Sequence, residues 1–131
     1  MSLKTAVYAV GSVVAIHIIA TIFNLYYTIG TLDIFMHFSG GVVMAMLALS
    51  LVYKAGLAFE PRHPKWFDFL FTLGFVMIAA VVWDLWEFAA DQMLKDRYPL
   101  GYNQISIKDT MGDLFMGGLG GTMSYLFFNK R

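Results

Sequence analysis

The sequence contains no cysteine and few charged residues. Without cysteine the chain has neither a disulfide scaffold nor the cysteine ligands of a structural zinc site. Charged residues make up 14% of the chain, whereas about 25% is usual in soluble domains. Nine basic residues balance nine acidic ones, so the chain lacks the positive excess by which proteins recognise nucleic acid. A chain of 131 residues has a large surface for its volume, and this little charge argues against a soluble domain.

Hydrophobic residues are abundant instead, at 59% of the chain against about 45–50% in soluble proteins. They form four runs of about 20 residues or more, the length that a helix needs to cross a bilayer. We therefore predict an all-α, polytopic membrane protein, in which a bundle of four transmembrane helices makes one domain over residues 1–131. The helices are expected at about residues 5–27, 34–53, 66–93 and 107–128. The first run is too long for a signal peptide and is expected to remain as a membrane helix.

Basic residues are unequally divided between the two ends of the predicted bundle. Six fall at one end and three at the other. Because loops rich in lysine and arginine stay in the cytoplasm, this division predicts a multi-pass protein of the cell inner (cytoplasmic) membrane with both termini cytoplasmic. The richer end carries Lys4, Lys54, Arg62, Lys65, Lys130 and Arg131, and the other carries Lys95, Arg97 and Lys108.

Acidic residues gather at the opposite, outer end. Consecutive helices of a bundle alternate in direction, so the start of the second and fourth helices meets the end of the third. The acids at these places are Asp33, Asp84, Glu87, Asp91, Asp109 and Asp113. Carboxylates this close to hydrocarbon are costly, and neighbouring carboxylates repel one another. A bound cation, shared protons or a basic partner must therefore compensate them.

The spacing of these residues predicts a metal site. Residues four apart share one face of a helix, as do Asp33 and His37, Glu87 and Asp91, and Asp109 and Asp113. Hard divalent cations prefer carboxylate oxygens, and imidazole is a common further ligand. We predict that a divalent metal (Mg, Mn, Ca or Zn) is held by Asp33, His37, Glu87, Asp109 and Asp113.

Other polar residues near this level are predicted to serve catalysis or substrate binding. Glu87, Asp91 and His37 are the candidate catalytic residues, with Glu87 or Asp91 as a general base. The candidate substrate-binding residues are Asn24, Asp84, Arg97 and Lys108. A simpler alternative exists for Asp33 and Asp109, since an acid at a helix start suits the helix dipole and Asp109 follows Ser106 at capping-box spacing.

Small and polar residues indicate how the helices pack. Gly41 continues the face of His37, and Gly117 and Gly121 continue the face of Asp113. Small residues let membrane helices approach closely, so the second and fourth helices are expected to pack through these faces. In the first helix a polar stripe faces the bundle, made of His17, Thr21, Asn24 and Thr28, with His17 expected as a hydrogen-bonded interior residue. Trp66, Trp83 and Trp86 suit the membrane interfaces.

Three motifs in order carry a family resemblance. They run from Asp33 through His37, Gly40 and Gly41, then over Trp83-Asp84-Leu-Trp-Glu87-Phe88, then from Asp109 through Asp113 into the glycines. In this order they resemble the YjdF-like bacterial inner-membrane family and, more distantly, the VanZ-like membrane proteins linked to teicoplanin resistance. The first family's motif usually has glutamate where this chain has Asp84, and the VanZ-like pattern has asparagine where it has Gly117. The resemblance implies a small integral membrane protein and supplies no reaction.

Three functions fit the sequence. The first is a metal-dependent membrane hydrolase or transferase that acts on a lipid-linked or envelope substrate at the outer interface. The second is a proton- or ion-coupled transporter, against which stands the scarcity of polar residues in the inner half of the bundle. The third is a non-catalytic module that binds a lipid or a partner helix. Membrane lipids are expected partners of all three, and the chain could form a homo-oligomer.

Overall fold

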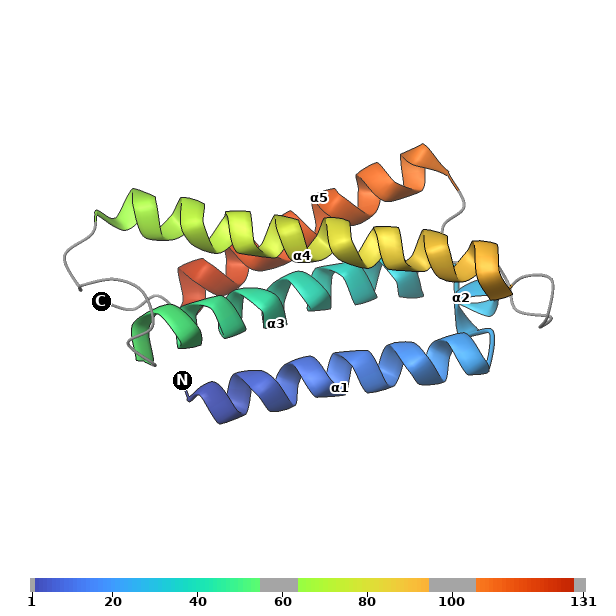
Figure 1. Ribbon diagram of the computed structural model, residues 1–131, viewed down its shortest axis with the longest axis horizontal. Helices are drawn as coiled ribbons and strands as arrows, with labels where there is room; N and C mark the ends of the chain where they lie inside the picture. The colour runs from blue at the N-terminus through green and yellow to red at the C-terminus, as the bar shows by residue number, and fades with distance from the viewer. Residues whose placement is uncertain (1, 55–63, 95–105, 129–131) are drawn as a thin grey trace.

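The computed structural model describes residues 2–54, 64–94 and 106–128, and every regular element in these ranges is a helix. Four long helices lie side by side in alternating directions, with the start of the first and the end of the last at the same end of the bundle (Figure 1). The elements are α1 (Leu3–Ile22), α2 (Leu25–Thr28), α3 (Leu32–Lys54), α4 (Lys65–Leu94) and α5 (Ile107–Phe128). The all-helical fold predicted from the sequence is thus confirmed.

The first predicted helix is shorter than expected. We predicted one helix over residues 5–27, but α1 ends at Ile22 and the short α2 follows. Asn24 causes the break, because its backbone is left-handed with a φ of 53°, a conformation that asparagine tolerates better than most residues. The other three long helices begin and end within two residues of their predicted bounds.

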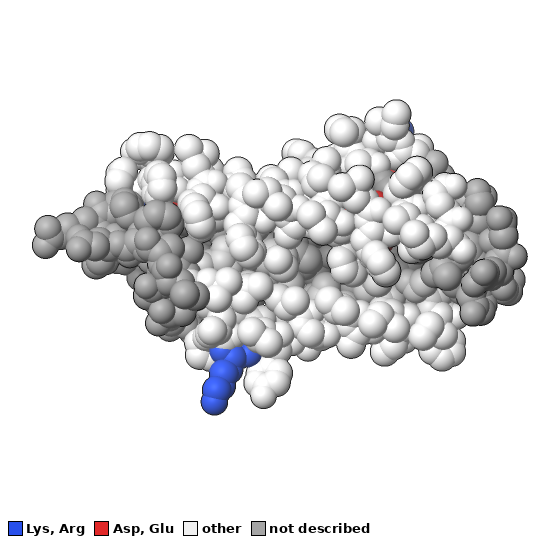
Figure 2. Space-filling model, viewed as in Figure 1, with Lys and Arg blue, Asp and Glu red and all other residues white. Residues whose placement is uncertain are grey.

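Three of the described helices are long and apolar enough to cross a membrane, namely Leu3–Ile22, Leu32–Leu51 and Lys65–Met93. Their outward side chains are large and apolar, as Ile16 on α1 and Ile78 on α4 illustrate. Figure 2 shows that the middle of one face of the molecule is free of charged side chains. The surface therefore suits hydrocarbon. The fourth long helix, α5, has 22 residues and differs from the three spans in its many glycines.

Glycines hold α3 and α5 together at the core of the bundle. A Cβ at Gly41 would overlap the carbonyl group of Gly117, and one at Gly120 would overlap the carbonyl oxygen of Phe38. These two helices are the most extensively packed pair in the described part of the chain. The predicted packing of the second and fourth long helices through their glycines is confirmed, and it sets the level at which the polar side chains of α3 and α5 meet.

The helix α1 packs differently from the rest. Among the described residues, its Cα atoms come within 8 Å of those of α2 and α3 but not of those of α4 or α5. Its backbone therefore lies close to that of one long helix only, and it reaches α4 through the side chain of His17.

Candidate metal centre

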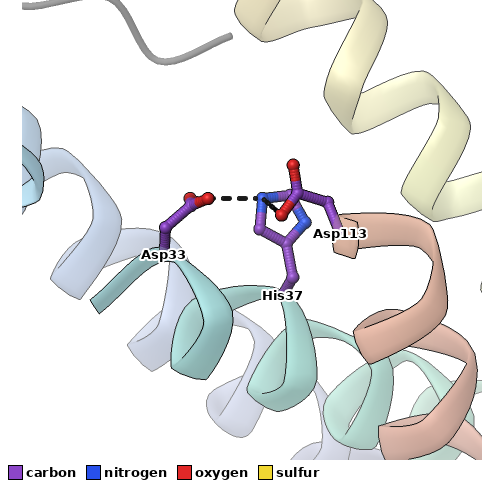
Figure 3. A group of neighbouring side chains, drawn as sticks. All are labelled: Asp33, His37 and Asp113. Carbon is purple, nitrogen blue, oxygen red and sulfur yellow. Dashed lines mark ion pairs between the residues drawn. The ribbon is translucent and has the colours of Figure 1, made fainter. Parts of the chain in front are cut away.

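His37 lies at the centre of a cluster of carboxylates that come from three helices. It occupies the second turn of α3 and is buried. Its Nε2 atom lies 3.4 Å from Oδ1 of Asp33, 3.8 Å from Oε2 of Glu87 and 3.8 Å from Oδ1 of Asp113. Its Nδ1 atom lies 3.9 Å from Oδ1 of Asp84. In Figure 3 the carboxylates of Asp33 and Asp113 converge on the ring from α3 and α5.

Local helix geometry and helix packing bring these groups together. Asp33 and His37 are four residues apart on α3, and Asp84 and Glu87 are three apart on α4, so each pair shares one helix face. Asp113 reaches the cluster because the glycine contact lies one turn further along α5, where a Cβ added at Gly117 would lie 3.8 Å from the His37 carbonyl oxygen. The site thus depends on the close α3–α5 packing.

The cluster is strongly acidic and shielded from solvent. The side chains of Asp84, Glu87 and Asp113 are each at most 6% exposed, whereas that of Asp33 is 25% exposed. Both carboxylate oxygens of Asp84 are buried without a hydrogen-bond partner among the described residues. Buried polar groups almost always have partners, and several carboxylates around one imidazole exceed the single positive charge that the imidazole can carry. A cation would neutralise this excess.

The spacing of the ligand atoms fits such an ion. Two groups can be drawn in which all ligand atoms lie within 4.8 Å of one another, Asp33 with His37 and Asp113, and His37 with Asp84 and Glu87. Ligands on opposite sides of an ion bound at about 2.0–2.6 Å lie about 4.0–5.2 Å apart. Both groups are therefore close to the size that a metal ion requires.

The two nitrogens of His37 face different partners. Three carboxylates lie on the Nε2 side, and Asp84 lies alone on the Nδ1 side. Histidine ligands commonly bind a metal through one nitrogen while the other faces a carboxylate that orients the ring. Asp84, a predicted substrate-binding residue, belongs to the second ligand group, and its place on the Nδ1 side also suits the orientation of His37.

A second histidine borders the cluster. His17 of α1 pairs with the hydroxyl group of Tyr26 at 2.7 Å through Nδ1, which also lies 4.0 Å from Oε1 of Glu87. The Trp83 ring packs edge-on against the His17 ring, with the ring centroids 4.6 Å apart. His17 is thus the hydrogen-bonded interior histidine that we predicted.

Sequence reasoning missed Tyr26 and misplaced Trp83. In one continuous first helix Tyr26 would not face His17. The only sign in the sequence of a different path was Asn24, a residue type that tolerates the left-handed conformation found just before α2. Trp83 was grouped with the interface tryptophans, but it is only partly exposed and contacts His17, whereas Trp66 and Trp86 are 63% and 62% exposed.

The structure separates several predicted site residues from this cluster. Neither Asp91 nor Asp109 belongs to a metal group among the described residues. Asp91 is buried one turn beyond Glu87. Asp109 is partly exposed, and its backbone N–H donates to Oγ of Ser106 at 3.2 Å, as the alternative of a helix-start role predicts. Of the predicted substrate-binding residues, Asn24 is partly exposed at the start of α2, Lys108 is exposed on α5, and Arg97 lies outside the described residues.

Comparison with known proteins gives a family but no function. No curated protein and no solved structure matches the chain significantly. A family model described as "Predicted membrane protein (DUF2238)" matches residues 2–131. This match names neither the YjdF-like nor the VanZ-like family of the predicted resemblance. Together with the apolar helices, it establishes a multi-pass membrane protein, and the chain belongs to the DUF2238 family of predicted membrane proteins.

Proposed function

We propose that this protein binds one divalent metal ion through Asp33, His37, Glu87 and Asp113, and uses it to act on a lipid-linked or envelope substrate. The observation that carries the proposal is the convergence of carboxylates from α3, α4 and α5 on one buried imidazole, with those of α4 and α5 buried as well. A buried charge that lacks an oppositely charged partner destabilises the folded protein by several kcal/mol. A bound cation is therefore the simplest group that would stabilise this cluster.

The donor set is compatible with several divalent ions and indicates what the neighbouring residues would do. Three carboxylates and one imidazole nitrogen suit Mn²⁺ and Zn²⁺ as well as Mg²⁺ or Ca²⁺. Four protein ligands leave room for further ligands on the larger ions, as catalytic metal sites require. Such an ion would supply Lewis acidity towards a phosphoryl or carbonyl oxygen. His17 and Tyr26 lie beside Glu87 and would position the polar part of the substrate.

The topology in this proposal has four membrane spans. The 22 residues of α5 are enough to cross a bilayer, and α5 lies alongside α3 and α4 in Figure 1. We infer that both termini are cytoplasmic in the inner membrane, as the division of basic residues predicts. The metal centre then lies at the outer interface.

Transport is the alternative with some support. The inner half of the bundle has more buried polar side chains than we predicted, namely those of Ser50, Asp68, Thr72 and Ser124. However, Thr72 and Asp84 are 12 residues apart on α4, which is about 18 Å at 1.5 Å per residue. The fully buried residues between these levels on α3, α4 and α5 are glycines, alanines, valines and a leucine. This apolar interval favours a localised site over a polar path across the membrane.

Metal analysis tests the proposed function. The protein purified in detergent is expected to bind one divalent ion per chain, and chelation followed by addition of Mn²⁺, Zn²⁺, Mg²⁺ or Ca²⁺ identifies the preferred one. At about one hundred times the Kd, that ion should add about 2.7 kcal/mol to the free energy of unfolding, measured as a rise in Tm. A protein that binds none of the four ions, and whose Tm is unchanged by chelation, would contradict the proposal.

Asp84→Asn should separate stability from metal binding. The substitution replaces a buried carboxylate, whose oxygens lack hydrogen bonds among the described residues, with a neutral amide that is less costly to bury, so the metal-free protein should be at least as stable as the original. The metal affinity should fall about 10–100-fold, as for other residues that orient a ligand. Thermal unfolding in a chelator and metal titration measure the two effects. A complete loss of binding would instead make Asp84 a direct ligand.

A further inference from the structure

A cavity of about 570 Å³ adjoins the metal centre between α1, α3 and α4. Its side walls are apolar, made by Val10, Val13 and Val14 of α1 and by Ala79 and Ala80 of α4. Along its length these walls offer no side-chain hydrogen-bond donor or acceptor. The cavity is therefore built to hold hydrocarbon.

One end of the same cavity is polar. His17, His37 and Glu87 all line it, together with Tyr26. These side chains belong to the metal centre or border it directly. A molecule that fills the cavity would thus have its apolar part between α1 and α4 and its polar part beside the carboxylate cluster.

The cavity opens towards the membrane. Val82 and Trp86 of α4 line it and are also 60% and 62% exposed, so they lie at its mouth. No described Cα of α1 lies within 8 Å of one of α4, so the two walls do not close against each other. The lipid-facing surface around them is apolar, as the uncharged middle of Figure 2 illustrates. A ligand can therefore enter sideways from the hydrocarbon region without crossing a polar surface.

We propose that this cavity binds one hydrocarbon chain of a membrane lipid, with the polar head of that lipid beside His17 and the carboxylate cluster. The volume of the cavity lies within the range of about 300–1,000 Å³ that is usual for ligand pockets. The inference deepens the proposed function by assigning the substrate class. Only the position of the lipid head depends on the proposed metal centre, because the hydrocarbon chain of the lipid is held by the apolar walls.

Photolabelling in a bilayer tests this inference. The protein is reconstituted into vesicles of phosphatidylethanolamine and phosphatidylglycerol that contain a phosphatidylglycerol with a diazirine in the middle of one acyl chain. After irradiation, mass spectrometry locates the labelled residues. We expect the label to concentrate on the cavity walls at Val13, Val14, Ala79 and Ala80, above the level on outward residues such as Ile78.

Two tryptophan substitutions on α1 provide the matched comparison. Val14→Trp fills the cavity and should reduce labelling of Ala79 and Ala80 about tenfold or more, because the indole displaces several buried methylene groups. Val7→Trp places the same side chain at a position that is 53% exposed and does not line the cavity, and it should leave the labelling unchanged. Ala79→Phe on the opposite wall is the second filling variant, should Val14→Trp fail to fold.

Labelling that is uniform around the bundle, or that is unchanged by both filling variants, would overturn the proposal. Repeating the experiment in a chelator separates it from the proposed function. Wall labelling that persists in the chelator would support the lipid cavity whether or not a metal is bound, and labelling of a protein that binds none of the four ions would support the cavity while the metal analysis rejects the metal centre. Metal binding together with uniform labelling would reject the cavity alone.

Discussion

Asp113→Asn is expected to weaken divalent-metal binding by more than about a hundredfold, because it removes a proposed direct ligand and even residues that only orient ligands contribute about 10–100-fold. Asp113 is buried, and its Oδ1 lies 3.8 Å from Nε2 of His37. The amide retains one oxygen but loses the negative charge that balances the ion. The effect should appear as a loss of metal in a titration of the purified protein.

Asp109→Asn is the matched control for this prediction. It makes the same change one turn earlier on the same helix, at a partly exposed residue that belongs to no metal group among the described residues. Metal affinity should change by less than about tenfold, since only a distant surface charge is removed. Equal losses of metal affinity in the two variants would support the sequence-based prediction, in which both aspartates are ligands. Normal metal binding by Asp113→Asn would show that α5 supplies no ligand.

Gly120→Ala is expected to destabilise the bundle by about 3 kcal/mol or more, at the upper end of the cost of overpacking. The new Cβ would overlap the Phe38 carbonyl oxygen. A backbone atom cannot move aside as a flexible side chain can, so α5 must shift away from α3. Thermal unfolding in detergent measures the loss. The displacement should also weaken metal binding, because it moves Asp113 away from His37.

Gly112→Ala lies on the same helix and tests whether the effect comes from packing. A Cβ at this exposed glycine would meet no atom within 4 Å, and alanine is the better helix former. This variant should therefore be as stable as the original protein or slightly more stable. If the two alanine variants unfold at the same temperature, that result would contradict the close packing of α3 against α5 at Gly120.

Much of the fold could be predicted because hydrophobic length and helix periodicity act locally. The hydrophobic runs that form α3, α4 and α5 end where polar residues, glycine or proline interrupt them. The spacing of four residues correctly placed Asp33 and His37 on one helix face. However, periodicity predicts the helix face on which a side chain lies, but not how closely a neighbouring helix packs at that level. Asp109 and Asp113 share a face, yet only Asp113 lies where the glycines bring α5 against α3.

The remaining errors arise from features that one residue or one pair of helices determines. One left-handed residue, Asn24, ends α1 early and lets Tyr26 reach His17. Neither composition nor spacing encodes that turn strongly, because asparagine adopts it only occasionally. The apolar cavity could not be predicted either, since it arises because the backbones of α1 and α4 stay apart.

The distribution of the cluster over three helices has a consequence for membrane insertion. Asp33 and His37 belong to α3, Asp84 and Glu87 to α4, and Asp113 to α5, which is synthesised last. A nascent chain that has inserted α3 alone therefore places two polar residues near the membrane without their later neighbours. The proposed metal ligands come together only after α5 has packed against α3 and α4, so metal binding would mark the completion of folding in the membrane.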